Sequence, residues 1–194
     1  MPKPTRRAAS PRTELRDLID AIRASDAPAG VKTRIVAVDG AGGAGKSSLA
    51  GLLACELEAP IVHTDDFASW ENPVDWWPEL ITHALEPLAA GRSASYRPTS
   101  WGGEEKPPVV IEPAPFVILD GVTASRDAFR PYLTFSIWIE TPREVRLRRG
   151  LERDGPHARA QWEGWMQAED RYVERERPAE HADRVRPRDQ DWWD

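Results

Sequence analysis

Short apolar runs alternate along the chain with segments in which apolar residues recur at helical spacing. The apolar runs are rich in β-branched residues, as buried strands are; they are RIVAVDG, PIVHT, PFVILDG and LTFSIWIET. The segment ADRVRP is a further candidate for a short last strand. Because strands that alternate with helices form a covered parallel sheet, the pattern predicts an α/β fold, a doubly wound parallel sheet of about five strands with helices on both faces. Ligands of such sheets bind beyond the carboxyl ends of the strands.

The helical segments have recognisable starts and ends. Leu15, Leu18, Ile19 and Ile22 share one face of an expected N-terminal amphipathic helix. Pro142 suits the first turn of a later helix, because its fixed φ fits that position. Further helices are predicted over residues 46–57, 76–91, 123–132, 142–154 and 158–177. The proline-rich and charged segment 92–115 is typical of a long irregular excursion.

Composition and charge bound the class of protein. A chain of 194 residues with 40% hydrophobic content suits one globular domain, predicted over residues 13–187 between a disordered basic tail (1–12) and an acidic aromatic tail (188–194). The net charge of −6 disfavours a dedicated nucleic-acid binder. A single cysteine allows no internal disulfide, and no apolar run has the length of a membrane helix, so we expect a cytoplasmic protein without a membrane partner. The aromatic tail could contact a second subunit, so a homo-oligomer is possible.

A glycine-rich loop is the firmest chemical signal. Gly40, Gly45, Lys46 and Ser47 match G-x-x-x-x-G-K-[ST], between a predicted strand and a predicted helix. Backbone N–H groups of such a loop surround phosphate oxygens, Lys46 reaches the β- and γ-phosphates, and the Ser47 hydroxyl serves Mg²⁺. We therefore predict ATP and Mg²⁺ as cofactors; a glycine-rich turn without a ligand is the alternative. The predicted nucleotide-binding residues are Gly40, Ala41, Gly42, Gly43, Ala44, Gly45, Lys46, Ser47 and Ser48.

Acidic residues follow two of the predicted strands. Asp120 ends FVILD, where a carboxylate can hold the metal's water shell opposite Ser47; a turn Asp before Gly121 is the alternative. Asp65 and Asp66 follow the strand after the glycine loop, near the expected γ-phosphate, where one of them can take a proton from an acceptor hydroxyl. Adjacent side chains of an extended chain point to opposite sides, so we expect at most one to do so. A turn or helix cap is the other interpretation.

The helix after Pro142 carries arginines at helical spacing. Arg146, Arg149 and Arg153 share a face, and we predict that Arg149 and Arg153 neutralise charge on the transferring phosphoryl group. A solvated basic helix with surface ion pairs is the alternative.

These motifs occur in the order found in a known family. Over about residues 33–186 the sequence resembles the uridine kinase and phosphoribulokinase-like family of P-loop small-molecule kinases. The stretches that carry the resemblance are VAVDGAGGAGKSS, HTDDF, the stretch from NPVDWW to SYRP, FVILDGV, TPREVRLRRGLERDG and RYVERERPAEHADRVRP. That group includes pantothenate and nicotinamide riboside kinases. The resemblance implies a nucleoside-kinase-like P-loop fold with an arginine-bearing lid, and it implies that Asp65 is the catalytic base. Ala68 and the absence of a matching base-recognition histidine depart from uridine-specific members.

Aromatic residues near the acids are candidates for the acceptor site, because indole and phenol rings stack on flat ligands. A buried aromatic core under a long loop is the competing interpretation. The predicted substrate-binding residues are Asp65, Phe67, Trp70, Trp76, Tyr96, Arg97 and Trp101. Trp162 and Trp165 are interpreted as packing or lid residues.

The leading hypothesis is ATP-dependent phosphoryl transfer to a hydroxyl of a small metabolite, with Asp65, Lys46, Arg149 and Arg153 as catalytic residues. A nucleoside is the first candidate acceptor, and pantothenate, nicotinamide riboside or a sugar is the second. Another hypothesis is a nucleotide-binding switch or regulatory ATPase without an acceptor, which the glycine loop alone would permit. A third is a relic that binds its ligand without turnover.

Overall fold

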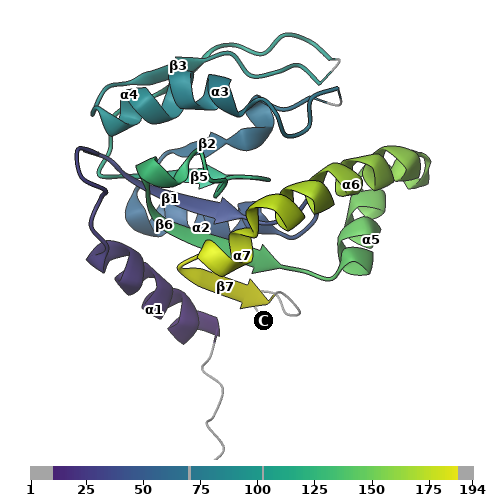
Figure 1. Ribbon diagram of the computed structural model, residues 1–194, viewed down its shortest axis with the longest axis horizontal. Helices are drawn as coiled ribbons and strands as arrows, with labels where there is room; N and C mark the ends of the chain where they lie inside the picture. Colours follow the sequence, from purple (N-terminus) through teal and green to yellow (C-terminus); the bar gives the residue numbers. More distant parts are fainter. Residues whose placement is uncertain (1–10, 70, 102, 188–194) are drawn as a thin grey trace, which may run out of the picture.

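A parallel sheet of five strands, in the order β2-β5-β1-β6-β7, forms the centre of the protein. The computed structural model describes residues 11–69, 71–101 and 103–187 (Figure 1). The strands of the sheet are β1 (Arg34–Asp39), β2 (Ile61–His63), β5 (Phe116–Asp120), β6 (Leu133–Glu140) and β7 (Arg184–Pro187). All pairings within this sheet are parallel, so the strands share one carboxyl edge. The predicted fold class is confirmed.

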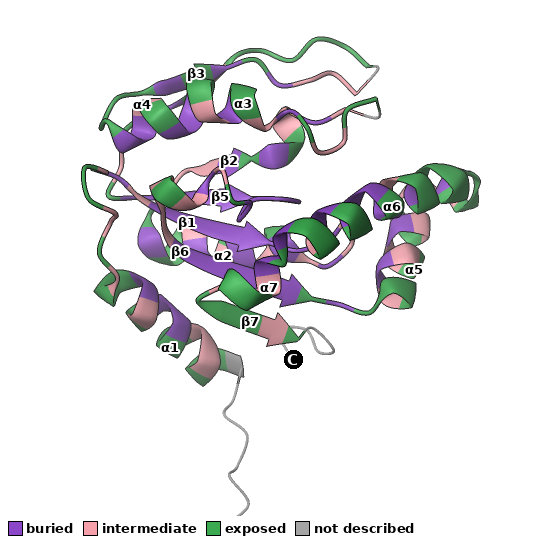
Figure 2. Cartoon of the chain, viewed as in Figure 1, coloured by how far each residue is buried: buried purple, intermediate pink, exposed green. Residues whose placement is uncertain are grey.

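Apolar residues on the two sides of β1 pack into two separate cores. On one side Val36 and Val38 contact helices α1 (Pro11–Ala24) and α2 (Lys46–Leu57). On the other side Ile35 and Ala37 contact the helical segment and hairpin that follow β2. Both faces of β1 are therefore buried (Figure 2), which explains its unbroken apolar sequence.

Most predicted helices are present. The segment 76–91 contains α3 (Trp77–Leu80), a π-helical turn (Ile81–Leu85) and α4 (Glu86–Ala89). The two long C-terminal helices are α5 (Arg143–Asp154) and α6 (Arg159–Glu176), followed by the short α7 (Pro178–His181). Figure 1 shows α5 and α6 extending beyond the carboxyl edge of the sheet, the edge at which a lid is expected.

Two local predictions are wrong. Residues 123–132 do not form a helix; a 3₁₀ turn (Arg130–Tyr132) is their only helical part. The N–H groups of Arg126 and Phe129 bond carbonyls three residues back and the Asp127 N–H bonds Glu176, so no α-helical hydrogen-bond ladder forms. The segment 92–115 is not wholly irregular, since β3 (Ala94–Tyr96) pairs with β4 (Val109–Ile111) in an antiparallel hairpin. The hairpin strands have three residues each, which is too short to give an alternating pattern.

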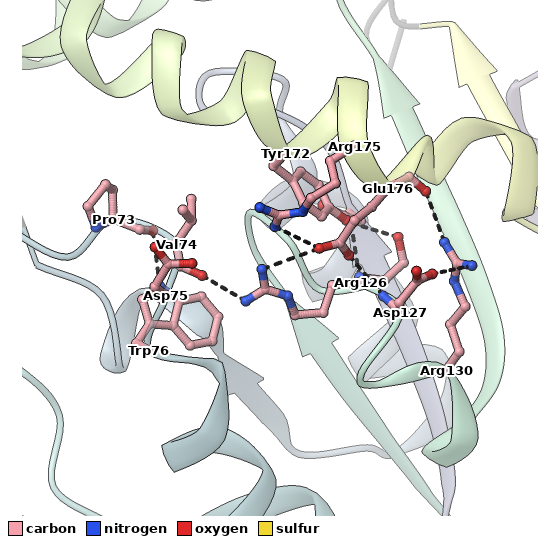
Figure 3. Close-up of polar contacts among 12 residues, drawn as sticks. Pro73, Val74, Asp75, Trp76, Arg126, Asp127, Arg130, Tyr172, Arg175 and Glu176 are labelled. Atoms are coloured by element: carbon pink, nitrogen blue, oxygen red, sulfur yellow. Dashed lines mark hydrogen bonds and ion pairs between the residues drawn. The ribbon is translucent and has the colours of Figure 1, made fainter.

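A buried ionic cluster joins α6 to the segment after β5. Arg126 lies 3.5 Å from Glu176 Oε1 and donates a hydrogen bond of 2.7 Å to the Val74 carbonyl (Figure 3). Glu176 also accepts from the Asp127 N–H at 2.9 Å and from Arg175 at 2.8 Å. These contacts hold the C-terminal end of α6 against the segment after β5, and Arg126 links that segment to the one that precedes α3.

The predicted tails fall mostly on residues 1–10 and 188–194, which lie outside the described residues. Helix α1 begins at Pro11, inside the segment predicted as a disordered tail. Among the described residues, no helix combines the length and the apolar character needed to cross a membrane.

Candidate active site

The glycine-rich loop connects β1 to α2 at the carboxyl edge of the sheet. Gly40 and Gly43 have positive φ angles of 152° and 75°. A Cβ atom at Gly43 would lie 2.7 Å from the Arg146 carbonyl oxygen, so glycine is required there. Lys46 is the first residue of α2 and donates from Nζ to the Ala41 carbonyl at 3.2 Å, across the loop. The loop thus has the lysine and the glycine backbone that a phosphate group requires.

A cleft of about 640 Å³ opens beside this loop. It is enclosed by the loop, the ends of β2 and β5, helix α5, helix α6 and the segment after β3. The sequence-predicted residues in its wall are Gly42, Gly43, Gly45, Lys46, Ser47, Ser48, Asp65, Trp101, Asp120, Arg149 and Arg153. The fold therefore brings most of the predicted phosphate-binding residues into one cleft with two of the predicted acceptor-side residues, Asp65 and Trp101.

Asp120 is buried at the end of β5, with 2% exposure. Its Oδ2 lies 3.2 Å from His63 Nδ1, and this hydrogen bond is the main cause that raises the pKa of His63. Its Oδ1 is buried and has no hydrogen-bond partner within the described part of the chain. Asp120 and Ser47 line the same cleft, and an unsatisfied carboxylate oxygen there fits a hydrated Mg²⁺, which proteins hold through one or two carboxylates and substrate phosphates.

Asp65 and Asp66 lie in a 3₁₀ turn (Thr64–Asp66) that follows β2. The assumption of an extended chain is wrong, because the turn brings both residues to the cleft; the expectation that at most one of them takes the proton stays a prediction. Their surroundings differ. Asp66 Oδ2 accepts from the Tyr96 hydroxyl at 3.3 Å, and burial together with Asp66 raises the pKa of Tyr96. The Asp65 side chain is exposed to the cleft, where it can meet a ligand.

Helix α5 presents two of its three predicted arginines to the cleft. Arg149 donates to the Gly43 carbonyl at 3.3 Å, within the glycine loop. Arg153 lies 5.5 Å from the Trp162 ring and forms two hydrogen bonds to Asp154. Arg146 faces inward instead, where it donates to the Thr141 carbonyl and to Glu169.

The predicted acceptor aromatics divide into two groups. Trp101 lines the cleft and donates from Nε1 to the Asp65 carbonyl at 3.0 Å. Phe67 lies 4.6 Å from the ring of Tyr96 and 6.1 Å from that of Trp76, and these three residues belong to the core behind the cleft wall. The core interpretation therefore describes Trp76 and Tyr96, with exposures of 3% and 6%. Arg97 is exposed and donates to the Lys106 carbonyl, away from the cleft, and Trp70 lies outside the described residues.

Sequence reasoning missed two buried acids. Asp39 accepts from the Gly40 N–H, from Ser125 and from the Tyr172 hydroxyl, which lies 133 residues away in sequence. Glu169 contacts the Gly42 N–H at 2.6 Å across 127 residues. No pattern in the neighbouring sequence predicts partners so distant. The sequence did hold one signal, since Trp162, Trp165 and Glu169 are spaced three and four residues apart and so share a face of α6.

Comparisons with known proteins agree on the fold. No protein-family model and no curated protein matches the sequence. A structure described as a possible uridine kinase from Bacillus stearothermophilus is 19% identical, covers 90% of this chain and 97% of its own, and has a TM-score of 0.67. A structure described as a fructose transport system kinase from a Silicibacter species is 21% identical, with coverages of 89% and 98% and a TM-score of 0.72.

A structure described as a sugar kinase from a Janibacter species is 22% identical, with coverages of 82% and 88% and a TM-score of 0.52. At these identities the similarity concerns the fold. The chain has the α/β fold of P-loop small-molecule kinases, in agreement with the family that its motifs resemble.

Proposed function

We propose that this protein transfers the γ-phosphoryl group of ATP to a hydroxyl of a small metabolite. The observation that carries the proposal is the single cleft in which Lys46, Arg149 and Asp65 meet. Phosphoryl transfer depends on positioning and on neutralising charge, and these residues supply two cations on the donor side and a carboxylate on the acceptor side. A nucleotide switch requires the loop and has no need of an acceptor carboxylate.

Each residue has a role that its position supports. Lys46, Arg149 and Arg153 contact phosphate oxygens, and Arg149 already reaches the loop carbonyl of Gly43. Ser47 and Asp120 would hold Mg²⁺, which when bound shields the phosphate charge. Asp65 accepts the proton of the attacking hydroxyl, since its exposed side chain lines the cleft and that of Asp66 is bound to Tyr96.

The structures of similar fold and the cleft together support a chemical class for the acceptor. The similar structures are described as uridine, fructose-transport and sugar kinases, whose acceptors carry several hydroxyl groups. A nucleoside is our first candidate, because Trp101 provides an indole next to Asp65 on which a flat base can stack. A sugar is the second.

ATP consumption with and without a pool of small metabolites tests the proposal. We expect the pool to stimulate ADP formation and one metabolite to gain a phosphoryl group, detected by mass spectrometry. ATP hydrolysis that no metabolite changes would favour the switch, and ATP binding without any turnover would favour a relic.

A further inference from the structure

Glu169 is a buried carboxylate that the roles above leave unused. It lies on α6, is 1% exposed, and contacts three donors from three parts of the chain. Oε1 accepts from the Gly42 N–H at 2.6 Å and from Trp165 Nε1 at 2.6 Å. Oε2 accepts from Arg146 at 3.1 Å. One side chain thus joins the glycine loop, helix α5 and a tryptophan of the cleft wall.

The contact with Gly42 fixes the loop at a point where it faces the cleft. A Cβ atom placed on Gly42 would lie 2.9 Å from Glu169 Oε1 and 3.2 Å from the Trp162 ring, so α6 closely covers this residue. Burial raises the pKa of Glu169, and the donors around its carboxylate oppose that effect. Charge-assisted hydrogen bonds of this kind are the stronger ones, so the loop conformation depends on Glu169.

The contact with Trp165 leads to the acceptor side. The Trp165 ring lies 5.6 Å from the Trp101 ring, at an interplanar angle of 40°. Trp101 in turn donates to the backbone carbonyl of Asp65. Both indoles line the cleft, one from α6 and one from the segment after β3. A continuous set of contacts therefore runs from Gly42 through Glu169, Trp165 and Trp101 to Asp65.

We propose that Glu169 is a positioning residue that anchors the glycine loop and orients Trp165, so that Trp165 and Trp101 form the acceptor wall beside Asp65. The inference rests on the proposed function and specifies its acceptor, which has a planar or apolar face that two indoles cover while its hydroxyl meets Asp65. Acceptor affinity then depends on Glu169 through Trp165, and nucleotide affinity depends on Glu169 through Gly42.

Steady-state kinetics with the stimulating acceptor separates these effects. Trp165→Phe keeps an aromatic ring and removes the N–H that Glu169 orients, and we expect the acceptor KM to rise about tenfold with kcat within about twofold. Glu169→Gln should raise the acceptor KM by about the same factor. In the double variant the KM should exceed that of Glu169→Gln by less than about twofold, because both changes break one linkage.

Binding of ADP provides the second readout. Glu169→Gln should weaken ADP about tenfold, because the Gly42 N–H loses its charged partner, and Trp165→Phe should leave the ADP Kd within about twofold. Asp170→Asn is the matched control, since Asp170 also links α6 to α5, through Arg143, and both side chains are about half exposed. Both ligand affinities of this control should stay within about twofold of wild type.

The outcomes distinguish the two proposals. Two results would overturn the role of Glu169. One is an acceptor KM in the double variant that rises by the product of the two single-variant factors. The other is an ADP Kd of Glu169→Gln equal to that of Asp170→Asn. If no acceptor stimulates the wild-type protein, the proposed function fails; the acceptor wall fails with it, and the ADP measurement alone then decides whether Glu169 anchors the loop.

Discussion

Arg149 donates a hydrogen bond to the Gly43 carbonyl at 3.3 Å, which connects the lid helix α5 to the glycine loop across 106 residues of sequence. Both residues line the cleft, so the guanidinium lies where phosphate oxygens are expected. The predicted lid is thus in contact with the loop.

Arg149→Ala should lower kcat about 100-fold, because a preorganised donor to the transferring phosphoryl group is lost. Arg148 is the matched control. It is exposed on the neighbouring face of α5, where it pairs with Glu152, so Arg148→Ala should leave kcat unchanged. An equal loss of kcat in Arg149→Ala and Arg148→Ala would show that α5 serves only as a basic surface.

Asp65→Asn should reduce acceptor-dependent turnover by about 10²- to 10⁴-fold, because the general base is removed. ADP binding should stay unchanged. Asp66→Asn gives the comparison, since Asp66 lines the same cleft and is bound to Tyr96. We expect a smaller loss from Asp66→Asn in the same ADP-release assay, and the reverse order would assign the base to Asp66.

The sheet and the loop were predictable because their signals are local. Strand β1 is buried on both faces and therefore apolar throughout, and the glycine loop follows it directly. The contacts of Asp39 with Ser125 and Tyr172 and of Glu169 with Gly42 were not predictable, since these partners lie 86 to 133 residues away and a lone acid carries no sign of burial. For Trp76 the sequence left two interpretations open, because an indole suits a core as well as a ligand, and its 3% exposure favours the core.

Gly150→Ala should destabilise the protein by about 1 to 3 kcal/mol, because a Cβ atom on α5 would lie 2.3 Å from the Trp162 ring. Gly164→Ala on α6 is the control, since nothing lies within 4 Å of its added Cβ, and alanine there should stabilise the helix by up to about 1 kcal/mol. Urea unfolding measures both. A neutral Gly150→Ala would contradict the close packing of α5 on α6.

Glu176→Gln should destabilise the protein by about 2 kcal/mol at pH 7, because it removes the charge that faces Arg126 and Arg175 (Figure 3). Burial alone would raise the pKa of Glu176, but its hydrogen bonds to Arg175 and the Asp127 N–H, with Arg126 nearby, lower it overall from 4.5.

A lowered pKa in the folded state means that the unfolded chain binds more protons as the pH falls, so the charge's contribution to stability is present above pH 4.5 and lost below it. The difference in unfolding free energy between wild type and Glu176→Gln should therefore shrink on going from pH 7 to below 4.5. Glu180→Gln removes an exposed pair with Arg177 and should have little effect at either pH. A difference that does not change with pH would contradict this account.

In the proposed function one cleft joins ATP to a small hydroxyl acceptor, and the first measurement to make is a coupled ADP-release assay with ATP and Mg²⁺. The acceptors are uridine, cytidine, other nucleosides, nicotinamide riboside, pantothenate and simple sugars, with Asp65→Asn as the control. Stimulation by one acceptor that disappears in Asp65→Asn is the predicted result. ATP binding without stimulation by any acceptor would contradict the claim.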